Sequence, residues 1–393
     1  MKAAALLLAA LAAPVHAAWT WDEAITVNSA VGPAVFPHLE SANRQGVAVS
    51  AGSVGVVWED NRSGSPQCYL AVKPAKAKVF KREARLSRGE CYEPVVLALG
   101  GGRFLAAWEE DGKVRAQVWP GGKPVQLSKA AAAQVTLAQG AKALYAAWAE
   151  QDGRFKRIVV AELGVKDQAL GVKSAQPVEA ATPIDEQGWP ALAVAHDGSV
   201  TVAWEDRRHR HTVPMVSHSR DGKPFAPPAR LSDIQSGSAP GGLGAGTGAM
   251  RPTLARWGEQ GLVAVWLDKR DFLSGYDVYA AFDPGTRRFG RNLRVQDSFG
   301  DNMAQWHALV VSDGTRLVAL WDDARDGTPD VWLSEWEGEA FGEDIAVPAA
   351  HGPGEQTDPV ATLDGSGALH VVWLDRDEKA GTRVRYARAV RKN

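Results

Sequence analysis

The sequence is poor in several residue types and patterns, and each shortage counts against a class of protein. It has only two cysteines, Cys68 and Cys91, with no further cysteine or histidine at ligand spacing, which argues against zinc. Its formal net charge is −2 without a basic stripe, so nucleic acid is a poor partner. No apolar run after residue 17 is long enough to span a membrane. Hydrolase, metalloprotease, phosphate-binding and dinucleotide-binding motifs are missing, so we expect no cofactor.

The first residues have the pattern of a secretory signal peptide. Lys2 supplies the positive start, residues 3–13 form a short alanine-rich apolar run, and Val15-His16-Ala17 fits a small-residue cleavage site. We therefore expect a signal peptide at 1–17, a secreted or periplasmic mature protein, and a single domain at 18–393. In an oxidising compartment the two cysteines could pair, or they could remain as two thiols.

What the sequence does contain is a recurring phrase: small apolar residues, a tryptophan, any residue, an acid and often an arginine. Seven tryptophans stand in this register: Trp58, Trp108, Trp148, Trp204, Trp266, Trp321 and Trp373. The intervals between them run from 40 to 62 residues. Self-similarity in this range is typical of propellers and other repeat proteins.

Each repeat has the pattern of four short antiparallel strands. In five repeats a proline, or in one case a histidine, stands 14 residues before the tryptophan: Pro94, Pro190, Pro252, His307 and Pro359. A proline at the first residue of a strand gives up a hydrogen bond that the ladder does not yet need. Glycine-rich turns between short apolar runs indicate hairpins. We predict an all-β fold, a β-propeller of seven four-stranded blades, with six blades as the alternative.

The two ends of the repeat region predict how the ring closes. The last repeat, 359–390, has three strands and lacks a fourth. Residues 21–27 resemble the fourth strand of the preceding repeat, 341–347. We therefore expect the N-terminal strand to complete the C-terminal blade. The first repeat is irregular, because Pro37 lies far ahead of its tryptophan and a longer segment, 39–45, intervenes.

The repeats resemble those of the sialidase-like propellers, the exported bacterial type with Asp-box (BNR) repeats. The resemblance rests on Ser-Arg-Asp-Gly-Lys-Pro-Phe at 219–225, one residue shorter than the Ser-x-Asp-x-Gly-x-x-Trp/Phe pattern, and on the Trp-x-Asp-x-Arg phrase. It covers the mature chain and implies the fold more than the activity. Active sialidases also have an Arg-Ile-Pro phrase, further substrate-binding arginines and a Tyr–Glu nucleophile pair. This sequence has no Arg-Ile-Pro and no recognisable Tyr–Glu pair.

The loops after Trp-x-Asp-x-Arg should gather around one mouth of the central channel, on the face where each first strand begins. Their repeated acids and arginines could bind a sugar or an anion, since the arginine fork suits carboxylates. They could instead hold their own loops together, and recurrence favours this role because a catalytic residue is needed only once. The repeated candidates for ligand binding are Asp206, Arg208, Asp268, Arg270, Asp323 and Arg325.

Residues that differ between repeats at the start of the first strand are better functional candidates. The candidates for ligand binding are Tyr92, Trp189, Arg251, Trp306, His307 and Asp358, and Glu93 and Gln187 vary in the same positions. The two tryptophans could stack on sugar rings or pack at a loop, whereas Arg251 and Asp358 could orient a polar ligand or remain solvated. Ca²⁺ could bind among the clustered aspartates, although no aspartate run has regular ligand spacing, and we assign no metal ligand.

Two functions remain open for this chain. The first is a monomeric, non-catalytic module that binds a glycan or a protein on the channel-mouth face. The second is an exo-acting, sialidase-like glycoside hydrolase whose catalytic residues have diverged. The missing Arg-Ile-Pro and Tyr–Glu pair favour the first and leave no catalytic residue to name. Two non-repeated carboxylates converging in the channel mouth, one with a raised pKa, would favour the second.

Overall fold

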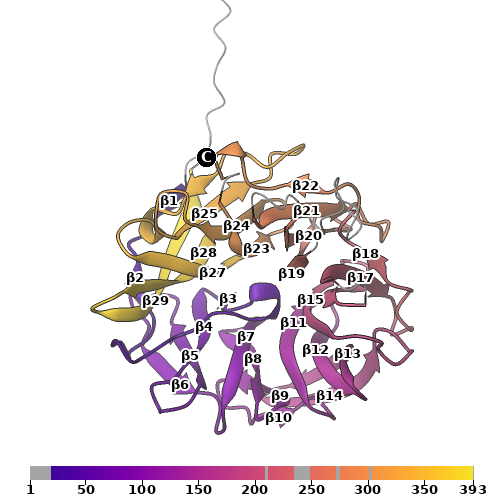
Figure 1. The fold of residues 1–393 in the computed structure, drawn as a ribbon. Helices are drawn as coiled ribbons and strands as arrows, with labels where there is room; N and C mark the ends of the chain where they lie inside the picture. The colour runs from indigo at the N-terminus through magenta and orange to yellow at the C-terminus, as the bar shows by residue number, and fades with distance from the viewer. Residues whose placement is uncertain (1–18, 209–210, 234–247, 271–274, 301–302, 393) are drawn as a thin grey trace, which may run out of the picture.

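Seven antiparallel sheets stand as blades around a central channel, as Figure 1 shows. This computed structural model describes residues 19–208, 211–233, 248–270, 275–300 and 303–392. The predicted signal peptide at 1–17 lies outside them. Among the described residues the helical segments are three single 3₁₀ turns, and none could cross a membrane. The prediction of an all-β, seven-bladed propeller is confirmed, and the six-bladed alternative is wrong.

Within blades 1 to 6 the strands follow chain order from the channel outward. Blade 1 contains β3 (Val47–Ser50), β4 (Ser53–Asp60), β5 (Gln67–Lys73) and β6 (Arg82–Arg85). Blade 2 contains β7 (Cys91–Gly100), β8 (Arg103–Glu110), β9 (Lys113–Trp119) and β10 (Val125–Gln126). Blade 3 contains β11 (Ala132–Gln139), β12 (Leu144–Asp152), β13 (Phe155–Lys166) and β14 (Ala169–Pro177).

The next three blades repeat this order, each with an outer strand of two residues. Blade 4 contains β15 (Gln187–Val194), β16 (Val200–Asp206), β17 (Val213–Ser219) and β18 (Ala229–Arg230). Blade 5 contains β19 (Ala249–Trp257), β20 (Gly261–Asp268), β21 (Asp277–Asp283) and β22 (Leu293–Arg294). Blade 6 contains β23 (Trp306–Ser312), β24 (Leu317–Asp323), β25 (Asp330–Glu335) and β26 (Ile345–Ala346).

Blade 7 joins the two ends of the described chain. It contains β27 (Glu355–Leu363), β28 (Leu369–Asp377) and β29 (Gly381–Arg391), with β1 (Trp19–Trp21) and β2 (Ile25–Thr26) outside them. Trp19 lies opposite Arg391, and Ile25 lies opposite Tyr386. The prediction that the N-terminal strand completes the C-terminal blade is confirmed.

The seven repeat tryptophans lie on the second strands of the blades, and each is at most 1% exposed. Because side chains two residues apart share one face of a strand, the acid of Trp-x-Asp lies beside the indole. In blades 1 to 6 the indole N–H donates to that acid at 2.8–3.1 Å. Trp373 in blade 7 is the exception, with no hydrogen-bond partner for its N–H among the described residues. The repeated phrase therefore packs each blade and satisfies its buried indole.

The first strands of blades 2 to 7 share a bulge near their beginning, where the pairing with the second strand shifts by one residue. One non-glycine residue in each bulge has left-handed backbone, with φ between 51° and 60°: Glu93, Gln134, Trp189, Arg251, His307 and Asp358. This conformation is uncommon for such residues and costs roughly 1–3 kcal/mol. Because it recurs at the equivalent position of six first strands, six different side chains lie at the channel mouth.

The position of His307 corrects one sequence inference. The 14-residue spacing puts His307 in the place that proline occupies in other repeats. Pairing of Leu309 with Leu320 shows instead that Ala308 holds that place and that His307 is the bulge residue. The hairpin from β23 to β24 is one residue shorter than its counterpart in blade 5, where Thr253 pairs with Val265. The alignment that the 14-residue spacing predicted is therefore wrong by one residue in this blade.

The irregular segment before blade 1 folds into the central channel. The 3₁₀ turn η1 (Ala42–Arg44) touches the first strands of blades 2 to 5. Gln45 bonds the backbone of Leu137 through its amide N–H at 2.6 Å and its carbonyl at 2.8 Å, and Asn43 accepts the backbone N–H of Leu254 at 2.9 Å. Arg44 donates to the carbonyl of Pro359 at 2.9 Å. The segment therefore ties blades 2 to 5 and 7 together from inside the ring.

Candidate functional site

Two rings of side chains lie on the face where the first strands begin and the second strands end. The outer ring is formed by the repeated pairs Asp60–Arg62, Asp206–Arg208, Asp268–Arg270 and Asp323–Arg325. The inner ring is formed by the six left-handed bulge residues, which lie on the first strands next to the channel. The sequence-predicted residues divide between these rings, apart from Tyr92 and Trp306, each of which precedes an inner-ring residue.

In the outer ring, each acid is buried and saturated with contacts. Asp206, 1% exposed, accepts hydrogen bonds from Trp204 Nε1 at 3.1 Å, Arg208 N at 3.0 Å and Arg208 Nε at 2.8 Å. Burial raises the pKa of Asp206, but the hydrogen bonds and charge of Arg208 outweigh it and hold the pKa below its usual value. Asp323 makes the same contacts to Trp321 and Arg325, whereas Asp268 accepts hydrogen bonds from Trp266 Nε1 at 2.9 Å and from an Nη of Arg270 at 2.6 Å.

Most N–H groups of the outer-ring arginines are engaged as well, although the buried Nε of Arg270 has no hydrogen-bond partner among the described residues. The guanidinium carbon of Arg270 lies 3.8 Å from the ring centre of Tyr279, and that of Arg325 lies 4.2 Å from the ring of Trp332. Their remaining N–H groups meet acids outside the phrase, as Arg325 does with Asp344 at 2.8 Å. These contacts support the structural role for the repeated pairs, because few donors are left to meet a ligand.

The inner ring is held by carboxylates from the preceding blade. They come from the variable residue directly after three of the tryptophans: Glu59, Glu205 and Asp322. Glu59 accepts the backbone N–H of Glu93 at 2.8 Å, Glu205 that of Arg251 at 2.8 Å, and Asp322 that of Asp358 at 3.1 Å. Sequence analysis missed these three acids. The sequence signal for them was the variable residue between the tryptophan and the acid of each phrase, to which we assigned no role.

One side of the mouth, formed by blades 4 to 7, is an ion-pair network. Arg251 pairs with Glu205 at 2.8 Å and with Glu40 at 2.9 Å, and its guanidinium lies 3.4 Å from the ring centre of Trp189. Burial raises the pKa of Glu40, but the charges of Arg44 and Arg251 outweigh it and lower the pKa. Glu40 is therefore a carboxylate at neutral pH. It lies in the irregular segment before blade 1, and sequence analysis missed it.

His307 belongs to the same network. Its Nδ1 lies 2.6 Å from Asp322 and its Nε2 lies 3.2 Å from Asp358. Burial lowers the pKa of His307, but the two aspartates outweigh it and raise the pKa. Burial raises the pKa of Asp358, but the charges of His307 and Arg44 outweigh it and lower the pKa. The structure thus brings together four predicted residues: Trp189, Arg251, His307 and Asp358.

The opposite side of the mouth, in blades 1 and 2, is acidic. Burial, supported by neighbouring carboxylates, raises the pKa of Glu93 to about 8 and that of Glu59 to about 7. Burial also raises the pKa of Glu109. Glu93 Oε2 is buried and has no hydrogen-bond partner among the described residues. At neutral pH Glu93 therefore carries a proton.

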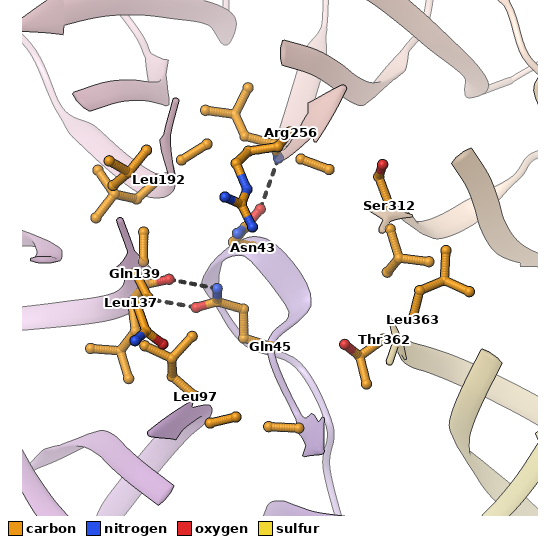
Figure 2. A pocket seen from close by; sticks show the side chains of 18 of the residues that line it. Asn43, Gln45, Leu97, Leu137, Gln139, Leu192, Arg256, Ser312, Thr362 and Leu363 are labelled. Atoms are coloured by element: carbon orange, nitrogen blue, oxygen red, sulfur yellow. Dashed lines mark hydrogen bonds between the residues drawn. The ribbon is translucent and has the colours of Figure 1, made fainter. Parts of the chain in front are cut away.

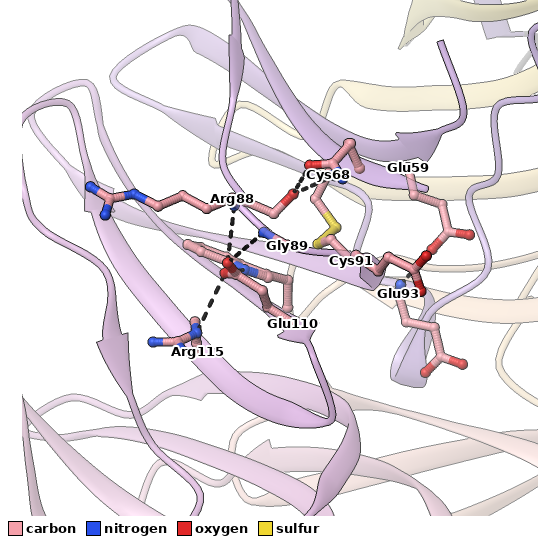
Figure 3. The surroundings of a disulfide bond; sticks show 12 residues. Glu59, Cys68, Arg88, Gly89, Cys91, Glu93, Glu110 and Arg115 are labelled. Carbon is pink, nitrogen blue, oxygen red and sulfur yellow. Dashed lines mark hydrogen bonds and ion pairs between the residues drawn. A yellow bond between two sulfur atoms is a disulfide. The ribbon is translucent and has the colours of Figure 1, made fainter. Parts of the chain in front are cut away.

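A disulfide supports this acidic side. Cys68 in β5 and Cys91 in β7 are bonded, which confirms that the two cysteines pair, and they connect blades 1 and 2. Glu59 lies opposite Cys68 in the pairing of β4 with β5, and Glu93 follows Cys91 by two residues. Figure 3 shows both glutamates beside the disulfide. The bond therefore joins β7, which carries Glu93, to β5, the strand paired with the Glu59 strand β4.

The two remaining predicted residues lie at the edge of the mouth. Trp306 is 41% exposed and packs against Tyr276 with ring centres 5.2 Å apart. Tyr92 donates to Glu90 at 3.2 Å. A cavity of about 450 Å³ adjoins the acidic side and is lined by Phe36, Pro37, His38, Glu59, Asp60, Asn61, Pro66, Arg376 and Thr382. An aromatic pair and a cavity thus flank the charged centre.

One group of side chains could hold a metal ion. Ligand atoms of Glu40, His307 and Asp358 lie within 4.8 Å of one another. A histidine with two carboxylates differs from the all-oxygen set that Ca²⁺ takes. Arg44 and Arg251 already neutralise these carboxylates. The outer-ring aspartates, which the sequence suggested for Ca²⁺, are separated by blade and paired with arginine.

The fold and the mouth define a seven-bladed propeller with a non-repeated, acid-rich centre on one face. No protein-family model and no curated protein matches the chain. Among solved structures it is similar to the polysaccharide lyase Uly1, with 10% identity and a TM-score of 0.59 over 89% of this chain and 90% of that one.

Two further solved structures are similar over most of this chain. One is an alpha-L-arabinanase of Penicillium chrysogenum complexed with arabinobiose, with 14% identity and a TM-score of 0.52 over 93% of this chain and 98% of that one. The other is a Trypanosoma rangeli sialidase, with 8% identity and a TM-score of 0.50 over 87% of this chain and 52% of that one. At such identities the likeness establishes the fold alone, one that carbohydrate-active enzymes share.

Proposed function

We propose that this chain is an exported carbohydrate-active propeller that cleaves a glycosidic bond at its channel mouth. The observation that carries the proposal is a pair of non-repeated glutamates with opposite protonation. The pKa of Glu93 is raised to about 8, whereas that of Glu40 is lowered. Pairs whose environments separate their pKa values in this way are typical of acid–base catalysis. Membership of the Asp-box propellers, the signal peptide at 1–17 and export belong to the same proposal.

The chemistry assigns one role to each glutamate. Glu93 transfers its proton to the glycosidic oxygen as the bond from that oxygen to the anomeric carbon breaks. Glu40, an ionised carboxylate, takes a proton from a water whose oxygen bonds to the anomeric carbon. Proton exchange with solvent then restores both groups. The negative charge of Glu40 contributes to raising the pKa of Glu93, which supports their proximity.

The surrounding residues suit a sugar ligand. Trp306 and Tyr276 offer an exposed aromatic surface, and sugar rings stack on such surfaces through their apolar faces. Trp189, beneath the Arg251 guanidinium, offers a second aromatic ring. The three similar structures are a polysaccharide lyase, an arabinanase with arabinobiose and a sialidase, which supports a saccharide as the substrate class.

The second candidate function is glycan binding without cleavage. It is favoured by the ion-pair network on the blade 4 to 7 side, where Arg251 is held by Glu205 and Glu40. A rigid, pre-paired surface of this kind suits recognition, because few side chains need to be ordered when the ligand binds.

The test measures sugar release by the purified chain 18–393 from a panel of neutral and acidic oligosaccharides, between pH 5 and 9. We expect release to fall as pH rises through about 8, because Glu93 then loses its proton. Glu93→Gln should lower kcat about 100-fold or more and leave binding intact. Glu339→Gln, on an exposed turn of blade 6, is the matched control and should change neither.

The outcomes separate the two candidates. Release that Glu93→Gln leaves unchanged would contradict the assigned acid. Saturable binding without release at any pH would contradict cleavage and support the binding module. Neither binding nor release across the panel would contradict both.

A further inference from the structure

The channel has a second mouth, on the face where the first strands end. A cavity of about 550 Å³ lies there, surrounded by the C-terminal halves of the first strands (Figure 2). Asn43, Arg44 and Gln45 form part of its lining, and hydrogen bonds to β11 and β19 hold this segment across the channel. The cavity is therefore separated by η1 from the charged mouth described above.

The lining of this cavity combines aliphatic side chains with polar groups. Branched aliphatic side chains from every blade form its walls, among them Val49, Leu97, Leu137, Leu192, Leu254, Val311 and Leu363. The polar groups include Gln139, Arg256, Ser312 and Thr362, which Figure 2 shows around the cavity. Ligand sites in proteins are typically 300–1,000 Å³ in volume, largely apolar, with a few polar groups that orient the ligand.

Arg256 is the distinctive residue of this cavity. It stands near the end of β19 and has no ion pair or side-chain hydrogen bond with any residue that the structure describes, unlike the arginines of the outer ring. The nearby acid Asp364 is already occupied, since it accepts hydrogen bonds from Ser366 at 2.6 Å and contacts His370 at 3.1 Å. The cavity therefore presents an exposed arginine that has no ion-pair partner among the described residues.

We propose that this second mouth binds a small polyhydroxy carboxylate, of the size of a monosaccharide acid. The Arg256 fork would receive the carboxylate, because a guanidinium donates two parallel hydrogen bonds to one. The hydroxyls of Ser312 and Thr362 and the amide of Gln139 would meet the ligand hydroxyls, and the aliphatic walls would meet its carbon skeleton. The site uses none of the residues assigned to cleavage, so it does not depend on the proposed function.

The experiment is calorimetric titration of the purified chain 18–393 carrying Glu93→Gln, which removes turnover, with glucuronate as the probe. Glucose serves as the uncharged probe and inorganic phosphate as the anion without a carbon skeleton. Arg256→Gln should weaken glucuronate binding about tenfold or more, and Arg256→Lys less. Arg288→Gln, on the exposed turn between β21 and β22 of the same blade, is the matched control and should leave it unchanged.

The three probes separate the contribution of the carboxylate charge from that of the hydroxyl groups and carbon skeleton. Glucuronate binding that Arg256→Gln weakens and Arg288→Gln does not would support the proposal. If glucose binds as tightly as glucuronate, the carboxylate does not contribute and the role of Arg256 is contradicted. If phosphate binds as tightly as glucuronate, the site does not recognise the hydroxyl groups and carbon skeleton, which contradicts the proposed ligand class. No binding of glucuronate at millimolar concentration, or binding that Arg256→Gln leaves intact, would overturn the site. These binding results do not depend on cleavage at the charged mouth. A failure of the proposed function would therefore leave them unchanged.

Discussion

The outer and inner rings lie on one face of the propeller and differ in how they use charge. In the outer ring each acid is buried, bonded to its own tryptophan and matched by its own arginine, blade after blade. In the inner ring the residues differ at every blade, their contacts cross between blades, and some acids lack a cation altogether. Repetition therefore marks groups that hold each blade together, and variation marks groups available for chemistry.

The largest expected effect comes from removing an outer-ring acid. Asp206→Ala should lower the free energy of unfolding by about 3–5 kcal/mol, because it leaves Arg208 and the Trp204 indole N–H without their buried partner. Urea denaturation measures the loss. The matched control is Asp375→Ala in blade 7, which should cost less than about 1 kcal/mol, since Trp373 does not use that acid. Equal losses in the two variants would contradict the structural role of the outer ring.

A smaller effect is expected from the disulfide beside the acidic side of the inner ring. The bond closes a loop with a sequence separation of 23 residues, and opening it should lower the free energy of unfolding by about 3 kcal/mol. Urea denaturation with and without reductant measures this. The double variant Cys68→Ser and Cys91→Ser should match the reduced protein and show no response to reductant. A double variant as stable as the oxidised protein would contradict the prediction.

A third effect, which depends on pH, distinguishes the two rings. Glu93 binds its proton more tightly in the folded protein than in the unfolded chain, so its contribution to stability falls as pH rises from about 4.5 to about 8. Glu93→Gln should remove that fall, which a shift from 4.5 to about 8 makes about 5 kcal/mol over the whole range. Asp206 has the opposite sign, because its lowered pKa gives stability that is lost only as pH falls below about 4.

Denaturation midpoints measured between pH 4 and 9 test this contrast. Glu339→Gln should keep the wild-type slope. A Glu93→Gln profile parallel to that of the wild type would mean that Glu93 is ionised in the folded protein at neutral pH, which would also weaken its assignment as the acid.

Much of the fold could be predicted because its physical cause is local and repeated. A buried indole N–H needs an acceptor, and an acid two residues along the strand supplies it in six blades, as aspartate in four and glutamate in two. Ring closure was also visible, since residues 21–27 carry a strand pattern that the last repeat lacks. The 14-residue spacing failed only at His307, where a shorter hairpin moved the register by one.

The centre of the mouth could be predicted only in part. Trp189, Arg251, His307 and Asp358 were found because they vary at one strand position. Glu40 was missed because it lies in the irregular segment before blade 1, outside the repeat pattern. The protonation of Glu93 could not be predicted, because it depends on burial and on carboxylates that other parts of the chain bring close.

The completion of blade 7 by β1 and β2 has a consequence for synthesis. Trp19–Trp21 leaves the ribosome before any blade exists, yet its partners, Ala389–Arg391, are made after every blade. The edge of β29 and the segment that covers it therefore stay apart throughout elongation, and each is exposed to wrong partners meanwhile. The first strand made is the last to be paired, so the complete ring is an event at the end of translation.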